Sequence, residues 1–189
     1  ALIFGGALLV FAIIWLGRRL IAGSPSSELL AWVTTLVHYA LMLLYGLAIV
    51  RAMASYPAWR IWQLPIPTPV GLFLVRITSL AALLAVLNLA LRGLGAPFAI
   101  HLTEKLARDW LYKYTRNPMG LASLACLLAL GIYYQSLGFV LWVLFIVTPT
   151  WLYFAVVYEE RELELRFGQT YLDYKARTPR FLPGRPRQS

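Results

Sequence analysis

Long apolar runs alternate with short polar segments along most of the chain. A helix that crosses a membrane needs about 20 mostly apolar residues. Five runs meet or approach this length, at residues 2–21, 29–50, 70–91, 119–134 and 139–158. The pattern therefore predicts an all-α, polytopic membrane protein with about five transmembrane helices.

The last two runs are separated only by residues 135–138, so we expect them to form a tight antiparallel hairpin. A hairpin places the polar segments before and after it on the same side of the membrane. We predict three regions: a three-helix membrane region (1–92), a region with a loop, the hairpin and a polar cytosolic segment (93–183), and a disordered tail rich in proline and arginine (184–189).

Composition and charge support a membrane location. Hydrophobic residues make up 60% of the chain and charged residues 13%, whereas soluble domains have about 45–50% apolar and about 25% charged residues. The net charge is +9, but from Glu104 onwards basic and acidic residues are mixed rather than arranged as a basic stripe. The charge therefore indicates the positive-inside bias of an integral membrane protein, with its amino terminus outside and its carboxy terminus in the cytoplasm. No nucleic-acid partner is predicted.

Few polar residues interrupt the apolar runs. Arg76 and Asn88 lie near the ends of the third run, so we expect them to anchor the helix at the membrane interface. His38 lies within the second run and is expected to find a hydrogen-bond partner rather than a ligand. Cys126 is the one cysteine and is interpreted as a small buried hydrophobe, and no metal site is predicted.

The segment before the fourth run combines tyrosines with a basic residue. Pro118 favours the first position of a helix and keeps Asn117 out of helical geometry. The free amides and the dipole at such a helix start attract anions, and the Arg116 guanidinium suits a carboxylate. An ordinary interfacial belt, with Tyr112 and Tyr114 at the headgroups, has the same composition. Residue types alone favour the two interpretations equally.

Four glutamates follow the fifth run, at positions 159, 160, 162 and 164. For Glu162 and Glu164 the favoured interpretation is a solvated helix with salt bridges to Arg161 and Arg166. Glu159 and Glu160 adjoin the membrane, where a carboxylate can bind an ammonium or a sulfonium.

The predicted hairpin brings Arg116 and Asn117 to the same membrane face as Glu159 and Glu160. An arginine that binds a carboxylate and a glutamate that binds an ammonium would together hold an amino-acid-like group.

These motifs, in this order, resemble those of isoprenylcysteine carboxyl methyltransferases and the related bacterial phospholipid methyltransferases. The matching pieces are Tyr112-Lys113-Tyr114-Thr115-Arg116-Asn117-Pro118-Met119, Glu159-Glu160, Phe167-Gly168-Gln169-Thr170-Tyr171-Leu172-Asp173-Tyr174, Arg177-Thr178-Pro179-Arg180-Phe181-Leu182-Pro183 and the loop Gly95-Ala96-Pro97.

The resemblance implies a small helical membrane enzyme that binds S-adenosyl-L-methionine on its cytoplasmic side. It also implies that this cofactor is bound by Tyr112, Tyr114, Arg116, Asn117, Pro118, Met119, Glu159 and Glu160, with Arg116 and Glu160 as catalytic residues. Asn117 stands where the better-known subgroup has histidine, which removes a titratable group. Gly120 stands where the family usually has tyrosine, which removes an aromatic ring and its hydroxyl.

The resemblance leaves the methyl acceptor open: a prenylcysteine carboxylate, a phospholipid amine or another lipophilic small molecule would each enter from the membrane lipid. Two other functions also stay open. One is an NADPH-dependent reductase of the sterol type, since those enzymes have a similar carboxy-terminal helical layout. The other is a catalytically inactive membrane module of the same fold, which Gly120 would favour.

Overall fold

The computed structural model describes residues 2–23, 25–54, 63–93 and 105–184. These residues are mainly helical, and no strand occurs within these ranges; an isolated bridge pairs Gln63 with Ser136. The elements are α1 (Leu2–Leu20), α2 (Ser27–Ala54), α4 (Thr68–Gly93), the 3-10 turn η2 (Trp110–Lys113), α5 (Pro118–Tyr133), α6 (Leu137–Trp142), the π-helical segment η3 (Val143–Val147), α7 (Thr148–Tyr153), the π-helical segment η4 (Phe154–Glu159) and α8 (Glu160–Arg177).

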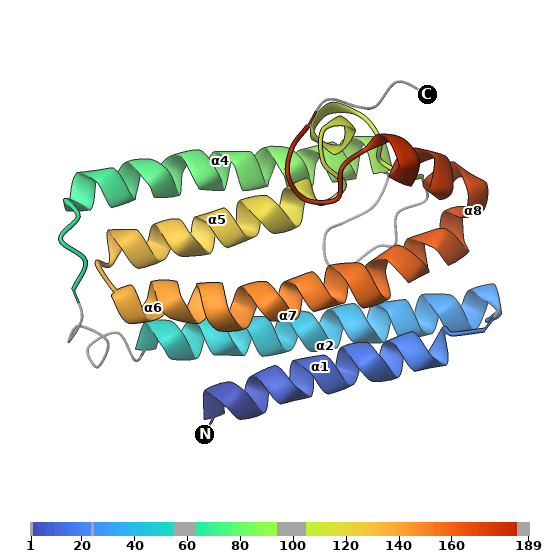
Figure 1. Ribbon diagram of the computed structural model, residues 1–189, viewed down its shortest axis with the longest axis horizontal. Coiled ribbons are helices and arrows are strands. Elements are labelled where there is room, and N and C mark those ends of the chain that lie inside the picture. Colours follow the sequence, from blue (N-terminus) through green and yellow to red (C-terminus); the bar gives the residue numbers. More distant parts are fainter. Residues whose placement is uncertain (1, 24, 55–62, 94–104, 185–189) are drawn as a thin grey trace.

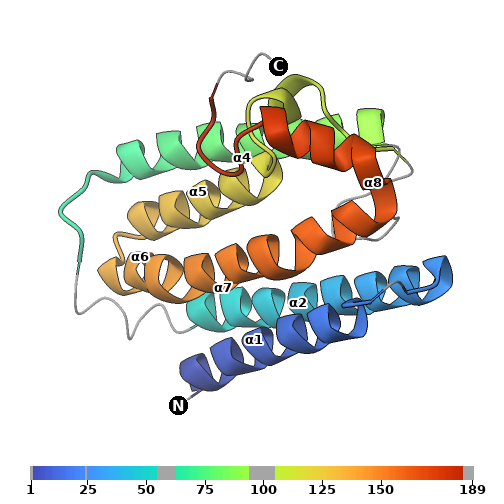
Figure 2. The same ribbon diagram turned by 45° about the vertical axis from the view of Figure 1, so that its right-hand side comes forward.

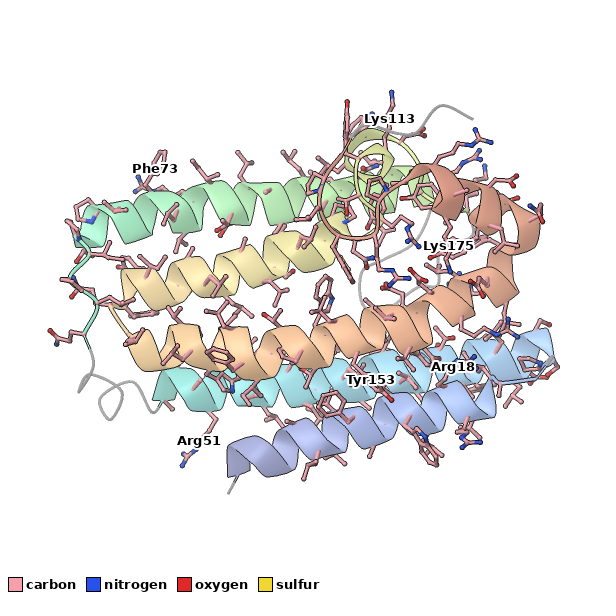
Figure 3. All side chains as sticks on the ribbon, in the orientation of Figure 1. Arg18, Arg51, Phe73, Lys113, Tyr153 and Lys175 are labelled. Atoms are coloured by element: carbon pink, nitrogen blue, oxygen red, sulfur yellow. The ribbon has the colours of Figure 1, made fainter. Side chains whose placement is uncertain are left out.

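Among the residues that the structure describes, three helices are long and apolar enough to cross a membrane: α2, residues Thr68–Leu91 of α4, and the helical run Leu137–Arg177, which comprises α6 to α8 and is kinked at Gly168. They coincide with the second, third and fifth predicted spans. The all-helical fold is therefore confirmed for the described residues, and the three apolar helices fit an integral membrane protein, while the count of five spans and the membrane hairpin stay predictions. Large apolar side chains point outward; Phe73, 60% exposed, projects away from α4 (Figure 3).

The last helical run is too long to lie wholly within a membrane. Its 41 residues would extend about 60 Å at 1.5 Å per residue, and the hydrocarbon layer is about 30 Å thick. Its apolar part ends at Tyr158, and the polar α8 continues beyond. Within α8 the backbone bends at Gly168, whose φ of 51° is readily available to glycine. The second half of α8 therefore turns back toward η2 and the start of α5 (Figures 1 and 2).

The helices pack in two neighbouring groups (Figure 1). In one group α4 runs beside α5, so closely that a Cβ at Gly71 would overlap the backbone of Tyr133. In the other, α1 packs on α2, α7 and η4 around the buried Tyr158. The turn from α5 to α6 links the two groups. At this turn the Ser136 side chain accepts a hydrogen bond from the backbone N–H of Phe139 and so caps the start of α6.

The polar residues within the apolar runs have different environments. His38 Nδ1 donates to the carbonyl of Thr34 at 2.8 Å, which confirms the expected hydrogen bond. Arg76 is exposed on α4. The prediction for Asn88 is wrong: its side chain is 0% exposed, and its Oδ1 accepts the backbone N–H of Leu111 at 3.1 Å. Asn88 therefore does not anchor α4 at an interface; it fixes η2 to α4.

Some predictions lie beyond the described residues. The loop of residues 95–97 falls within one gap, and residues 185–189 of the predicted disordered tail fall within another. The division of the chain near residue 93 stays a prediction.

Candidate functional site

The start of α5 has the geometry that the sequence predicts. Pro118 is the first residue of the helix, and Asn117 precedes it in a non-helical conformation (φ −127°, ψ 50°). The Asn117 side chain does not cap the helix; its Nδ2 donates to the carbonyl of Arg180 at 3.3 Å. The backbone N–H of Arg116 donates to the carbonyl of Pro179 at 2.9 Å. The segment before α5 is thus held by residues more than 60 positions later in the chain.

Arg116 and Glu160 bind each other directly. Arg116 Nη1 lies 2.7 Å from Glu160 Oε1, and each side chain is 8% exposed. The guanidinium also donates to the Thr178 carbonyl at 3.1 Å and to the Tyr171 hydroxyl at 3.3 Å. We expected these two residues to hold opposite ends of one ligand, and the structure brings them together as a buried ion pair.

Two further cations bind the Glu160 carboxylate. Arg180 donates to both oxygens, at 2.6 and 2.9 Å, and Lys175 Nζ lies 2.9 Å from Oε2. On a straight helix Lys175 would lie about 22 Å from Glu160, since 15 residues separate them. The bend at Gly168 turns the helix back and brings Lys175 to Glu160. Figure 3 shows Lys175 at the end of the molecule where α8 turns back.

Burial opposes ionisation of the Glu160 carboxyl, but these contacts outweigh it. Hydrogen bonds from Lys175 and Arg180, together with the charge of Arg116, hold the pKa of Glu160 below its ordinary value. Glu160 is therefore a carboxylate at neutral pH.

The chain after α8 covers the cluster; we call residues 178–184 the return segment. Thr115 Oγ1 donates to the carbonyls of Arg180 and Phe181, and the Gly184 N–H donates to the carbonyl of Tyr114. None of residues 175–183 is among the site residues predicted from the sequence. The basic, proline-containing pattern of residues 177–183 was the available signal.

Glu159 differs from its neighbour. It is partly buried, and within the described part of the chain its carboxyl has neither a hydrogen-bond nor an ion-pair partner. Burial raises the pKa of Glu159 to about 8, and the charges of Glu162 and Glu160 act in the same direction. A cation that reached Glu159 would lower that pKa and hold the group as a carboxylate.

The next two glutamates form the expected local ion pairs. Glu162 binds Arg166 at 2.6 Å, and Glu164 lies 3.7 Å from Arg161 and 2.9 Å from Lys175. The predicted pairing is confirmed. The prediction of a solvated side chain is wrong for Glu162, which is 2% exposed.

The remaining predicted residues surround the start of α5 unequally. Pro118 is buried, Met119 is partly buried, and Tyr114 is exposed. Tyr112 is linked to α8, because its carbonyl accepts the Tyr174 hydroxyl at 2.6 Å. Burial raises the pKa of the Tyr112 hydroxyl far above its ordinary value, and Tyr112 therefore stays protonated at neutral pH.

In the ranges described, no group of three His, Cys, Asp or Glu side chains could hold a metal ion. The arrangement consists instead of a buried, charged cluster at the polar end of an apolar helix pair.

Comparison with known protein families decides the assignment. The family of phospholipid methyltransferases matches residues 67–170, which is more than half of the 189-residue chain. The chain belongs to the phospholipid methyltransferase family. This confirms the resemblance and supports a membrane methyltransferase. No curated protein and no solved structure matches the chain.

Only part of the ion cluster of this phospholipid methyltransferase family member lies within the range that the family model matches. The matched range contains Arg116, Asn117, Glu159 and Glu160. Lys175, Arg180 and the return segment lie beyond it. The pair of Arg116 with Glu160 therefore falls in the family region, and the two other cations are added by the carboxy-terminal part of the chain.

Proposed function

We propose that this protein transfers a methyl group from S-adenosyl-L-methionine to a lipophilic acceptor, with a phospholipid amine as the acceptor that the family assignment favours. One observation carries the proposal: a cluster with excess positive charge lies beside an unpartnered carboxyl. The cofactor carries both a carboxylate and an ammonium, so it complements the two features.

The charges of the cluster can be counted. Arg116, Lys175 and Arg180 bind the single carboxylate of Glu160, and of these only Lys175 also binds Glu164. Three positive charges thus face two negative ones. The Lys175 and Arg180 side chains are 32% and 35% exposed, so they can turn toward an additional carboxylate at low cost. The amides at the start of α5 favour an anion at the same place.

Glu159 supplies the complementary charge. Its carboxyl lacks a partner within the residues described, and an ammonium beside it would compensate the cost of ionising a buried group. Glu160 is already bound by three cations, so Glu159 rather than Glu160 is the better ligand for an ammonium. When bound, the cofactor supplies a methyl group already activated by its sulfonium. The role of the chain is to position donor and acceptor in line and to exclude water.

An amine acceptor must lose a proton for transfer. Glu159 is not assigned this role, because the cofactor ammonium that it binds would lower its pKa and hold it as a carboxylate. Tyr112 does not act as a base, because its hydroxyl stays protonated. A carboxylate acceptor, such as a prenylcysteine, would need no base.

We further propose five membrane spans, with α1 and α5 as the two that are added to the three apolar helices, and with the ion cluster on the cytoplasmic side. The charge distribution supports this orientation: Arg18, Lys113 and Lys175 lie toward one end of the molecule and Arg51 toward the other (Figure 3). The tight turn between α5 and α6 and their packing support the hairpin.

The test is calorimetric binding of S-adenosylhomocysteine to the full chain in detergent. We expect binding by the wild-type protein and at least tenfold weaker binding by Glu159→Gln, which removes a charge-assisted contact of about 1.5–3 kcal/mol. Asp173→Asn, which removes an exposed carboxylate of α8 outside the ion cluster, is the control and should bind as the wild type does. Folded wild-type protein that binds neither this product nor the methyl donor at millimolar concentration would refute the proposal. NADPH binding in its place would favour a reductase.

A further inference from the structure

The packing between α5 and the last helical run changes along their length. Near the turn the two are close, because a Cβ at Gly131 would come within 3.0 Å of the Val140 side chain, and α5 packs on both α6 and η3. Farther from the turn, α7 and η4 approach α5 much less closely. The two helices therefore diverge toward the end that carries the ion cluster.

The indole of Trp151 lies between the two helices where they diverge. Trp151 belongs to α7, and its ring lies against Gly120 of α5. A Cβ at Gly120 would come within 3.0 Å of three atoms of the indole, including Nε1 at 2.6 Å. A side chain at residue 120 would therefore displace the indole from this position.

The indole also lies next to the ion cluster. Gly120 is four residues after Arg116 and lies in the first turn of α5, which begins at Pro118. On its other side Trp151 contacts Phe181, with ring centroids 5.3 Å apart and planes at 56°. Phe181 directly follows Arg180, which binds Glu160 through two hydrogen bonds. Trp151 is thus placed between the polar cluster and the apolar parts of α5 and α7.

We propose that Trp151 is a specificity-determining residue for the methyl acceptor, limiting the size of the amine that can reach the donor from the lipid. The proposal rests on the proposed methyl transfer. It also reinterprets Gly120: the aromatic ring missing from α5 is replaced in space by the ring of Trp151 from α7. Glycine at this position is then a partner of the tryptophan rather than a sign of lost activity.

The physical basis is the rigidity and volume of an indole that is held on two sides. A ring fixed by Gly120 and by Phe181 cannot move aside for a larger group without losing both contacts. A fitted apolar wall discriminates one methyl group by about 10–200-fold. Truncation of the ring should relax this discrimination while leaving the ionic contacts to the donor in place.

The experiment compares methylation of phosphatidylethanolamine and of its N-monomethyl and N,N-dimethyl derivatives in mixed vesicles. We expect Trp151→Ala to raise the rate ratio of the dimethyl lipid to the unmethylated lipid by about tenfold. Its affinity for S-adenosylhomocysteine should stay within about twofold of the wild type. Trp151→Phe, which retains a smaller ring, should give an intermediate ratio. It keeps the test usable if the alanine variant does not fold. Trp32→Ala removes an exposed tryptophan of α2 and is the control.

A double-mutant cycle tests the contact itself. Gly120→Ala should lower turnover at least tenfold in the wild-type background and by no more than about twofold in the Trp151→Ala background, because the overlap is then gone. Equal effects of Gly120→Ala in both backgrounds would overturn the proposal. So would acceptor ratios of both Trp151 variants that equal the wild type, or cofactor binding by the wild type without methylation of any of the three lipids. Absence of cofactor binding by the wild type would instead refute the proposed function.

Discussion

Replacement of Glu160 by glutamine should destabilise the protein through the loss of a buried ion pair. The carboxylate accepts four charge-assisted hydrogen bonds, one from Arg116, one from Lys175 and two from Arg180. Glutamine keeps one acceptor oxygen and directs an NH2 group toward cations. The Arg116 side chain is 8% exposed, so it would remain buried without its charged partner.

The magnitude follows from the burial of each partner. Breaking a buried pair by removing one member costs about 3–5 kcal/mol. Lys175 and Arg180 are about one-third exposed and can turn to water, so each adds only about 0–1 kcal/mol. We therefore expect a loss of about 4 kcal/mol. For a chain of this size that corresponds to a decrease in Tm of roughly 8–16 °C.

The assay is thermal unfolding in detergent, followed by tryptophan fluorescence, with Glu164→Gln as the control. The Glu164 side chain is 24% exposed, and its replacement should cost less than about 1 kcal/mol. The difference between Glu160→Gln and the wild type should also depend on pH. Because the folded-state pKa of Glu160 lies below its ordinary value of 4.5, the stabilisation is complete above pH 4.5 and is lost as the pH falls through the folded-state pKa.

Two results would contradict this reasoning. One is a Glu160→Gln variant that is as stable as Glu164→Gln at pH 7. The other is a stability difference between Glu160→Gln and the wild type that stays constant as the pH falls below 4.5. Either result would mean that the negative charge of Glu160 does not stabilise the folded protein through the cations around it.

Three further predictions concern other parts of the fold. Asn88→Ala leaves the partly buried backbone amide of Leu111 without its acceptor and should cost about 1–3 kcal/mol, measured by thermal unfolding, with faster hydrogen exchange in η2 as the specific readout. Gly71→Ala forces α4 away from α5 and should cost more than about 2 kcal/mol, whereas Gly46→Ala, where a Cβ meets nothing within 4 Å, should stabilise by about 0.5–1 kcal/mol; equal effects would contradict the close packing. Glu159→Gln should raise the Tm above pH 8 and have no effect below pH 4.5, because a pKa of about 8 means that ionisation of Glu159 costs stability as the pH rises between these values; a constant difference would refute it.

Much of the local structure could be predicted from the sequence. Apolar runs form helices, because backbone groups in lipid must be satisfied within the segment. Pro118 begins α5 as expected, and Glu162 pairs with Arg166 because residues four apart on a helix are neighbours. The grouping of Arg116, Asn117 and the Glu159–Glu160 pair at one end also followed from connectivity, since a tight turn returns the chain to the same side.

The partners within that group could not be read from the sequence. Arg116 binds Glu160 rather than an open position, and Lys175 reaches Glu160 only because the chain bends at Gly168. Asn88 looks like an interfacial residue until η2 is seen to pack over it.

Gly120 illustrates the same limit most clearly. By itself the sequence determined which segments are helical, where they begin, and which residues one turn apart can pair, because these depend on short-range geometry and on apolar length. Only the tertiary structure decided that Trp151 fills the space at Gly120 and that three cations converge on Glu160. Such contacts depend on how helices diverge and on where a distant segment returns, and neither is encoded in local periodicity.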